Sequence, residues 1–178
     1  NGYRLIVRAL GDVTDREAYD WQGNKTVYDA KAATLQVYEK LGLDPTIKPT
    51  MQHRAPYLAL SDYVKSGGNA SESLESLVRK LDRPWTHADL PMLKSWLDEN
   101  GPILDLLGEA VRKPTFCMPL IRKDPKAPLV ESLGTCQIQT TRSFARSLAA
   151  RANYRLGTGD IEGAMYDAIS QKRLGRHL

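Results

Sequence analysis

Histidines and carboxylates are the residues with which this sequence could perform acid–base catalysis or bind a metal. The three histidines, His53, His87 and His177, are far apart, and none has a second histidine or a cysteine within one helical turn. Helical metal sites need ligands on one face, as in the Glu-x-x-His pairs of di-iron bundles, and the sequence holds no such pair. The motifs therefore identify no catalytic residue, no metal ligand and no cofactor.

Two cysteines are the only thiols of the 178-residue chain. Cys117 and Cys136 are 19 residues apart, and neither belongs to a Cys-x-x-Cys pair, so zinc binding is not indicated. Two partly buried free thiols fit this spacing. One disulfide, formed in an oxidising compartment, fits it as well.

A glycine-rich stretch, G-T-G-D-I-E-G, covers residues 157–163 and raises the question of phosphate binding. A phosphate-binding loop follows a strand and carries Lys and Ser or Thr after its last glycine, whereas Ala164 and Met165 stand there and no strand is expected before it. A Gly-x-Ser-x-Gly nucleophile motif is also missing. The stretch therefore indicates a tight structural turn. An enzyme of unrecognised type, with its site between helices, stays an alternative.

Basic side chains gather in the segment 112–126, which is a candidate for contact with an acidic partner. The net charge of +4 is mild, and the segment holds a single aromatic residue on which a base could stack. A solvated loop is the simplest interpretation, and weak nucleic-acid binding is a second alternative. The candidate interaction residues are Arg112, Lys113, Phe116, Arg122 and Lys123.

Four further arginines lie on the last long helix that we expect. On a helical wheel Arg142 and Arg146 fall on one flank, and Arg151 and Arg155 fall on the opposite flank. The apolar stripe between the flanks consists of Ala145, Leu148, Ala149, Ala152 and Leu156. We therefore expect these arginines to border a core contact and to extend into solvent on both sides.

The elements that would position these residues are almost all helices. Apolar residues recur with helical period along most of the chain, which predicts an all-α fold arranged as an irregular multi-helix bundle. No apolar run is long enough to span a membrane. The predicted helices are a first one ending at Leu10, then 14–21, 26–41, 56–65, 69–81, 89–111 with a kink or break at Gly101-Pro102, 129–156 and 160–174.

The whole of 1–178 is expected to form a single helical domain, in which N-terminal helices of 1–50 pack on a core built from 55–178. The chain opens without Met, and Tyr3, Ile6 and Leu10 already keep helical spacing. We therefore expect a fragment of a longer chain. Its localisation stays open, with export or anchoring by a preceding segment as one alternative.

The last two predicted helices form a hairpin whose helices face each other through mostly small residues. These residues are Ala145, Ala149 and Ala152 on the first helix and Ile161, Ala164, Met165 and Ala168 on the second. The hairpin resembles a tetratricopeptide repeat, with Ala152 and Ala164 at its small positions and Gly159 at its turn. Arg155 departs from that pattern, and no copy lies 34 residues upstream.

A wider resemblance covers about residues 83–178. The block R-P-W-T-H-A-D-L-P-M-L-K-S-W-L-D-E-N, the basic-Pro-aromatic loop and the final hairpin are similar to uncharacterised, mostly helical proteins abundant in planctomycete bacteria. The resemblance implies a helical fold and carries over no activity. We expect a non-enzymatic scaffold or protein-interaction domain whose partner is another protein, with its oligomeric state open.

Overall fold

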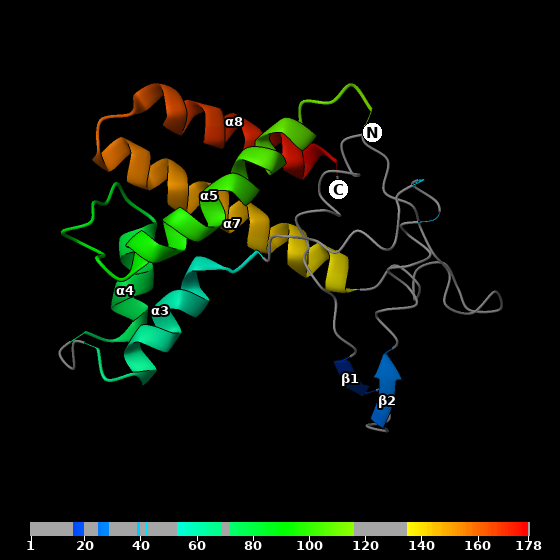
Figure 1. Cartoon of the computed structure of the whole chain (residues 1–178), viewed down its shortest axis with the longest axis horizontal. Helices are drawn as coiled ribbons and strands as arrows, with labels where there is room; N and C mark the ends of the chain where they lie inside the picture. The colour runs from blue at the N-terminus through cyan, green and yellow to red at the C-terminus, as the bar shows by residue number, and fades with distance from the viewer. Residues whose placement is uncertain are drawn as a thin grey trace.

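The computed structural model describes residues 16–19, 25–28, 39, 42, 53–68, 72–115 and 135–177. Helices dominate these ranges, and α7 and α8 lie side by side with α5 crossing them (Figure 1). The all-α class predicted from periodicity is confirmed. The elements are β1 (Arg16–Tyr19), β2 (Lys25–Tyr28), α3 (Pro56–Lys65), α4 (Leu74–Leu81), α5 (Leu93–Ala110), α7 (Thr135–Gly157) and α8 (Ile161–Arg176).

The strand β1 lies within the short helix that we predicted at 14–21, and β2 lies at the start of the helix that we predicted at 26–41. They pair antiparallel, with Glu17 opposite Val27 and Ala18 opposite Thr26. The prediction was wrong here because it relied on capping residues, while Thr, Val and Tyr in β2 favour strands. Of the rest of 26–41 the structure describes only Glu39, which is helical, and the first predicted helix lies outside the described residues.

The helix α3 begins and ends as the sequence predicts. Pro56 occupies its first turn, where the missing N–H has no intrahelical partner to lose. The chain leaves the helix through Gly67, whose φ of 83° is a conformation that favours glycine. The helix α4 begins later than predicted, because Ser73 caps it by accepting a hydrogen bond from the N–H of Ser76.

The helix α5 is continuous, although Gly101-Pro102 predicted a kink or a break. Pro102 lies inside the helix and is exposed, as is Asp98, whose carbonyl loses its helical donor there. Water can therefore satisfy that carbonyl. The buried side of α5 supplies Trp96 and Leu104 to the core, so both halves of the helix are held by packing.

One hydrophobic core joins the helices. Its largest fully buried side chains include Trp85, Trp96 and Phe144. The indole N–H of Trp96 donates to the carbonyl of Arg54 at 2.7 Å, and that of Trp85 donates to the carbonyl of Ala150 at 3.0 Å. Each buried indole therefore has its polar atom satisfied by the backbone of another segment.

Candidate interaction site

The hairpin of α7 and α8 is the part of the fold in which the chemically distinctive residues meet. Its turn contains Gly159 with a φ of 85°, a conformation that favours glycine. Asp160 then caps α8 by accepting a hydrogen bond from the N–H of Gly163 at 2.9 Å. Ala152 and Ala164 are buried, as expected for the small residues of a close helix contact.

Three residues predicted to be buried at the contact between α7 and α8 are exposed. Ile161 and Met165 are 63% and 59% exposed, and Ala168 is exposed as well. Their prediction was wrong because the buried stripe of α8 is rotated relative to the expected one. It consists of Ala164, Asp167, Ser170 and Leu174. The charged residue Asp167 therefore lies in the buried stripe of α8, where we expected apolar residues.

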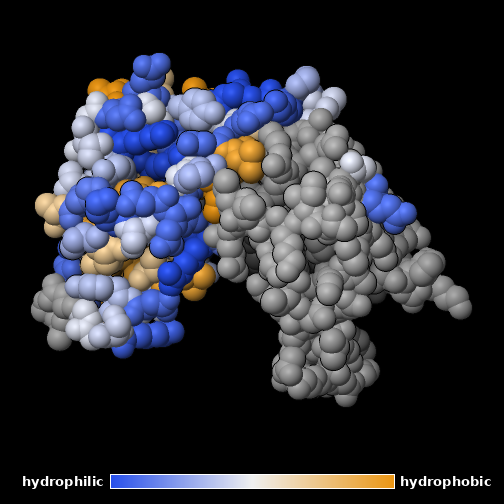
Figure 2. Space-filling view, viewed as in Figure 1, coloured by the Kyte–Doolittle hydropathy of each residue, from blue (hydrophilic) through white to orange (hydrophobic). Residues whose placement is uncertain are grey.

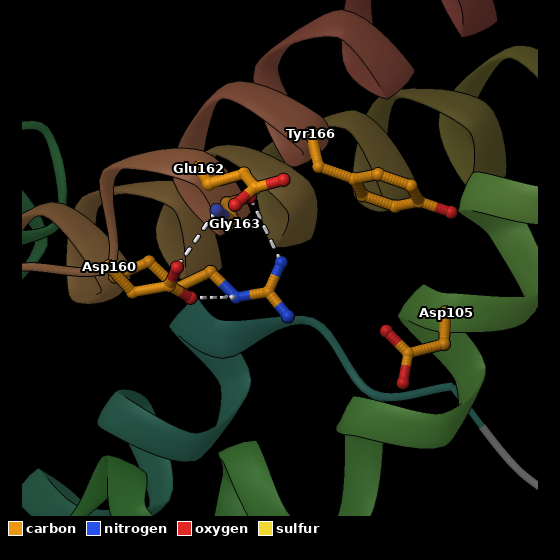
Figure 3. A pocket seen from close by; sticks show the side chains of 6 residues that line it. Asp105, Asp160, Glu162, Gly163 and Tyr166 are labelled. Atoms are coloured by element: carbon orange, nitrogen blue, oxygen red, sulfur yellow. Dashed lines mark hydrogen bonds and ion pairs between the residues drawn. The ribbon is translucent and has the colours of Figure 1, made fainter.

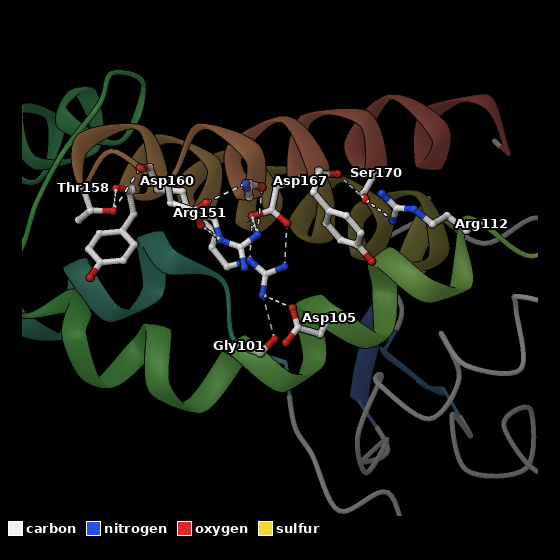
Figure 4. A network of polar contacts seen from close by, with 12 residues as sticks. Gly101, Asp105, Arg112, Arg151, Thr158, Asp160, Asp167 and Ser170 are labelled. Atoms are coloured by element: carbon white, nitrogen blue, oxygen red, sulfur yellow. Dashed lines mark hydrogen bonds and ion pairs between the residues drawn. The ribbon is translucent and has the colours of Figure 1, made fainter.

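Arg151 explains that buried charge, and it corrects our expectation that this side chain extends into solvent. It is only 4% exposed. Its guanidinium donates to both carboxylate oxygens of Asp167 at 2.9 and 2.7 Å, to Asp105 at 2.8 Å and to the carbonyl of Gly101 at 3.0 Å (Figure 4). This fork-like geometry is the strong form of an arginine–carboxylate pair. Arg151 thus ties α5, α7 and α8 together.

The electrostatics of Arg151 follow from two opposing effects. Burial disfavours the charged guanidinium, but the hydrogen bonds and the charge of Asp167, with a further contribution from Asp105, outweigh burial and raise the pKa of Arg151. The cation is therefore permanent. Arg155 adds a second donor to Asp167 at 2.9 Å, so this carboxylate, itself fully buried, is shared by two arginines.

An open polar pocket of about 340 Å³ lies beside this network (Figure 3). Its lining residues are Asp105, Arg155, Asp160, Glu162, Gly163 and Tyr166. The side chains of Asp105 and Asp160 are 67% and 52% exposed, and each is already ion-paired with an arginine. These two carboxylates therefore lack the burial that commonly prepares a catalytic acid or base. We interpret the pocket as the solvent-facing edge of a structural network.

His53 and Ser147 form a second pairing that could suggest chemistry. The Nε2 atom of His53 lies 2.9 Å from the Oγ atom of Ser147, 94 residues away in sequence. Ser147 is fully buried, and its hydroxyl already donates to the carbonyl of Ser143. Burial also lowers the pKa of His53 to about 4, so the imidazole is neutral at pH 7. The pair therefore belongs to the core, where no substrate reaches the hydroxyl.

His87 likewise contacts the core. Its Nε2 atom lies 2.9 Å from the hydroxyl of Tyr154, while its buried Nδ1 atom has no hydrogen-bond partner. Within the described part of the chain, no three histidine, cysteine, aspartate or glutamate side chains group closely enough to hold a metal ion.

Two of the five residues predicted as an interaction surface are bound within the chain. The guanidinium of Arg112 lies 3.5 Å from the ring centroid of Tyr166 and donates to Ser170 at 2.9 Å. Lys113 forms an ion pair with Glu109 at 2.7 Å. Both cations therefore already have a partner within the chain. The other three, Phe116, Arg122 and Lys123, lie outside the described residues, as do the side chains of both cysteines.

A groove of about 260 Å³ runs along the hairpin, between α7 and α8. It is lined by Ala149, Ala152, Asn153 and Leu156 of α7 and by Ala164, Met165, Ala168 and Gln171 of α8. The alanines make the hollow, and larger apolar side chains stand beside it. Leu156 is 43% exposed and Ile169 is 44% exposed, in addition to Ile161 and Met165.

On the face of the molecule seen in Figure 2, the described helices present mainly hydrophilic residues, with hydrophobic ones in small separate patches. We did not predict the groove from the sequence, because the hydrophobic period of α8 was assigned to its contact with α7. The alternation of Ile161, Met165 and Ile169 with the buried stripe was the signal that could have shown a second apolar face.

Comparison of the chain with known protein families, with curated proteins and with solved structures returns no match. The resemblance to uncharacterised planctomycete proteins and to a tetratricopeptide repeat therefore stays a prediction. Within the described residues, no helix combines the length and the apolar character that crossing a membrane requires.

Proposed function

We propose that this chain is a non-enzymatic helical scaffold that binds another protein, and that the bound element is a helix lying in the groove of α7 and α8. The observation that carries the proposal is the cluster of exposed apolar side chains around that groove, above all Met165 and Leu156. Large apolar side chains gathered beside a hollow are typical of surfaces that bind a partner.

The shape of the groove supports a helix as its occupant. The exposed residues Ile161, Met165 and Ile169 are spaced by four, so they form a straight ridge along α8. A second helix can lay its own apolar stripe between this ridge and Leu156, which is the helix-in-groove mode of recognition. The small side chains of Ala149, Ala152 and Ala168 would let that helix approach closely.

The chemistry of the other candidate surfaces gives less support to the alternatives. For an enzyme, two of the three carboxylates that line the polar pocket are already paired with Arg151 and Arg155. For nucleic-acid binding, Arg112 and Lys113 are engaged by Tyr166 and Glu109. The groove, by contrast, presents apolar surface with nothing in the described part of the chain to cover it.

A display selection tests the proposal. Random peptides of about 16 residues, long enough to match α8 as a helix, are displayed on phage and selected against the wild-type chain. Pools are then compared for binding to Met165→Glu and to Leu58→Glu, a matched control at an exposed leucine of α3. We expect peptides that bind the wild type and the Leu58→Glu control but do not bind the Met165→Glu variant. The proposal would be overturned if no peptides were enriched, or if the enriched peptides bound Met165→Glu as well as they bind the wild type.

A further inference from the structure

The groove differs in charge between its two ends. Leu156 and Met165 line the end of the groove near the turn, and both are apolar and exposed. Because the helices run antiparallel, the first half of α7 and the last turns of α8 lie at the same end of the hairpin, away from its turn (Figure 1). That opposite end carries basic side chains, so the groove passes from an apolar end to a basic one.

Three cations line up with the groove itself. Arg142 is seven residues before Ala149 and fourteen before Leu156, so it continues the groove side of α7. Lys172 and Arg176 are seven and eleven residues after Met165, so they continue the ridge of α8. All three are exposed, and none forms an ion pair within the residues that the structure describes.

We propose that the groove binds an amphipathic helix of a partner protein that carries acidic residues at one end, with its carboxylates over Arg142, Lys172 and Arg176. This inference rests on the proposed function and adds the chemistry of the partner. Apolar contact with Met165 and Leu156 provides affinity, while opposite charges at the basic end fix which way the helix lies. Acidic residues favour the first turn of a helix, so the N-terminus of the partner helix lies at the basic end.

Two synthetic peptides provide the test. Each is a helix of about 16 residues with the same leucine stripe, and the two differ only in carrying glutamates or lysines in the first turns. Binding of each labelled peptide to the full chain is measured by fluorescence anisotropy. We expect the glutamate peptide to bind the wild type at least about tenfold more tightly than the lysine peptide, and to weaken as salt is raised.

A charge reversal distinguishes a change in peptide preference from a variant that fails to fold. The double variant Arg142→Glu, Lys172→Glu is expected to bind the lysine peptide more tightly than the glutamate peptide, because a gain of binding requires a folded groove. Lys65→Glu on α3 is the matched control and should leave the preference unchanged. Met165→Glu should weaken binding of the glutamate peptide at least about tenfold, as expected for a residue at the centre of the contact.

The contrary outcomes are distinct. Equal binding of the two peptides, or preference of the wild type for the lysine peptide, overturns the acidic partner. If the display selection still returns peptides whose binding depends on Met165, the proposed function stands although the partner helix is not acidic. A dimer seen by light scattering that Met165→Glu dissolves would place a second copy in the groove and overturn the inference. Failure of both peptides to bind would overturn it too.

Discussion

At the scale of single residues, the molecule is organised around a guanidinium that solvent scarcely reaches. Arg151 meets carboxylates from two other helices, and its strongest partner, Asp167, is fully buried. Such a pair is not required for a stable core, since apolar side chains of similar volume often serve as well. Removing one partner is different, because it leaves a buried charge unpaired. The two carboxylates bound by Arg151 therefore contribute very unequally.

Substitutions at these two carboxylates measure that difference. Asp167→Asn removes the charge shared by Arg151 and Arg155, and we expect it to lower the free energy of unfolding by about 3–5 kcal/mol. Asp105→Asn removes a carboxylate that is 67% exposed and should lower it by less than about 1 kcal/mol. Urea denaturation followed by circular dichroism gives both values. Similar losses for the two variants would show that Arg151 does not depend on Asp167.

His53 makes stability depend on pH. The folded side chain binds a proton with a pKa of about 4, whereas the unfolded one has its ordinary pKa of 6.5, so the unfolded chain takes up protons first as pH falls. Stability therefore decreases between about pH 6.5 and pH 4, and this one group contributes a loss of about 2 kcal/mol at pH 5. The contribution is absent above about pH 7.

The variant His53→Gln isolates this contribution from that of the carboxylates. The free energy of unfolding of both chains is measured in urea at several values between about pH 7 and pH 5. We expect the wild type to lose about 2 kcal/mol more than the variant over that range. Parallel curves would mean that His53 is accessible to protons in the folded chain.

At the scale of elements, the last turns of α7 are held by the end of α4 and the segment that follows it. The indole of Trp85 bonds to Ala150, and the side chain of Asn153 donates to the carbonyl of Leu81 at 2.6 Å. The backbone of Trp85 then passes so close to Gly157 that a Cβ added there would overlap the carbonyl of Trp85. A glycine is therefore needed at the last turn of α7 for spatial reasons, not for its dihedral angles.

Two glycine substitutions test this contact. Gly157→Ala should destabilise the fold by about 1–3 kcal/mol, because the overlapping atom is backbone and cannot rotate away. Gly175→Ala in α8, where nothing lies within 4 Å of the added Cβ, should stabilise by up to about 1 kcal/mol. Thermal melting of the two variants beside the wild type decides the matter. A neutral Gly157→Ala would mean that the Trp85 segment moves away freely.

At the scale of the whole molecule, periodicity predicted the helical class and the order of the helices from α3 onward. It succeeded for α3 because Pro56 and Gly67 mark both ends in the sequence itself. It failed for β1 and β2, because capping residues such as Thr26 occur in turns as well as at helix starts. It also failed for the groove, because a helical wheel ranks residues by apolarity and so turned Met165 inward and Arg151 outward.

Those failures share one physical cause. Arg151 and Asp167 stabilise each other only after folding brings together residues 16 positions apart on different helices. Neither side chain alone carries a signal of burial, since arginine and aspartate are mostly exposed in proteins. Once this pair occupies the inner side of α8, the apolar ridge of Ile161, Met165 and Ile169 lies on the other side. The candidate site is therefore a consequence of the buried pair.

The pairing of Arg151 with Asp167 also limits how the sequence can change over generations. A lineage can carry the ion pair, or an apolar pair of similar volume, because each leaves no lone charge in the interior. Changing the ion pair into an apolar pair one residue at a time requires an intermediate protein with an unpaired buried charge. Descendants of this gene should therefore alter codons 151 and 167 together or leave both alone, while codon 105 drifts.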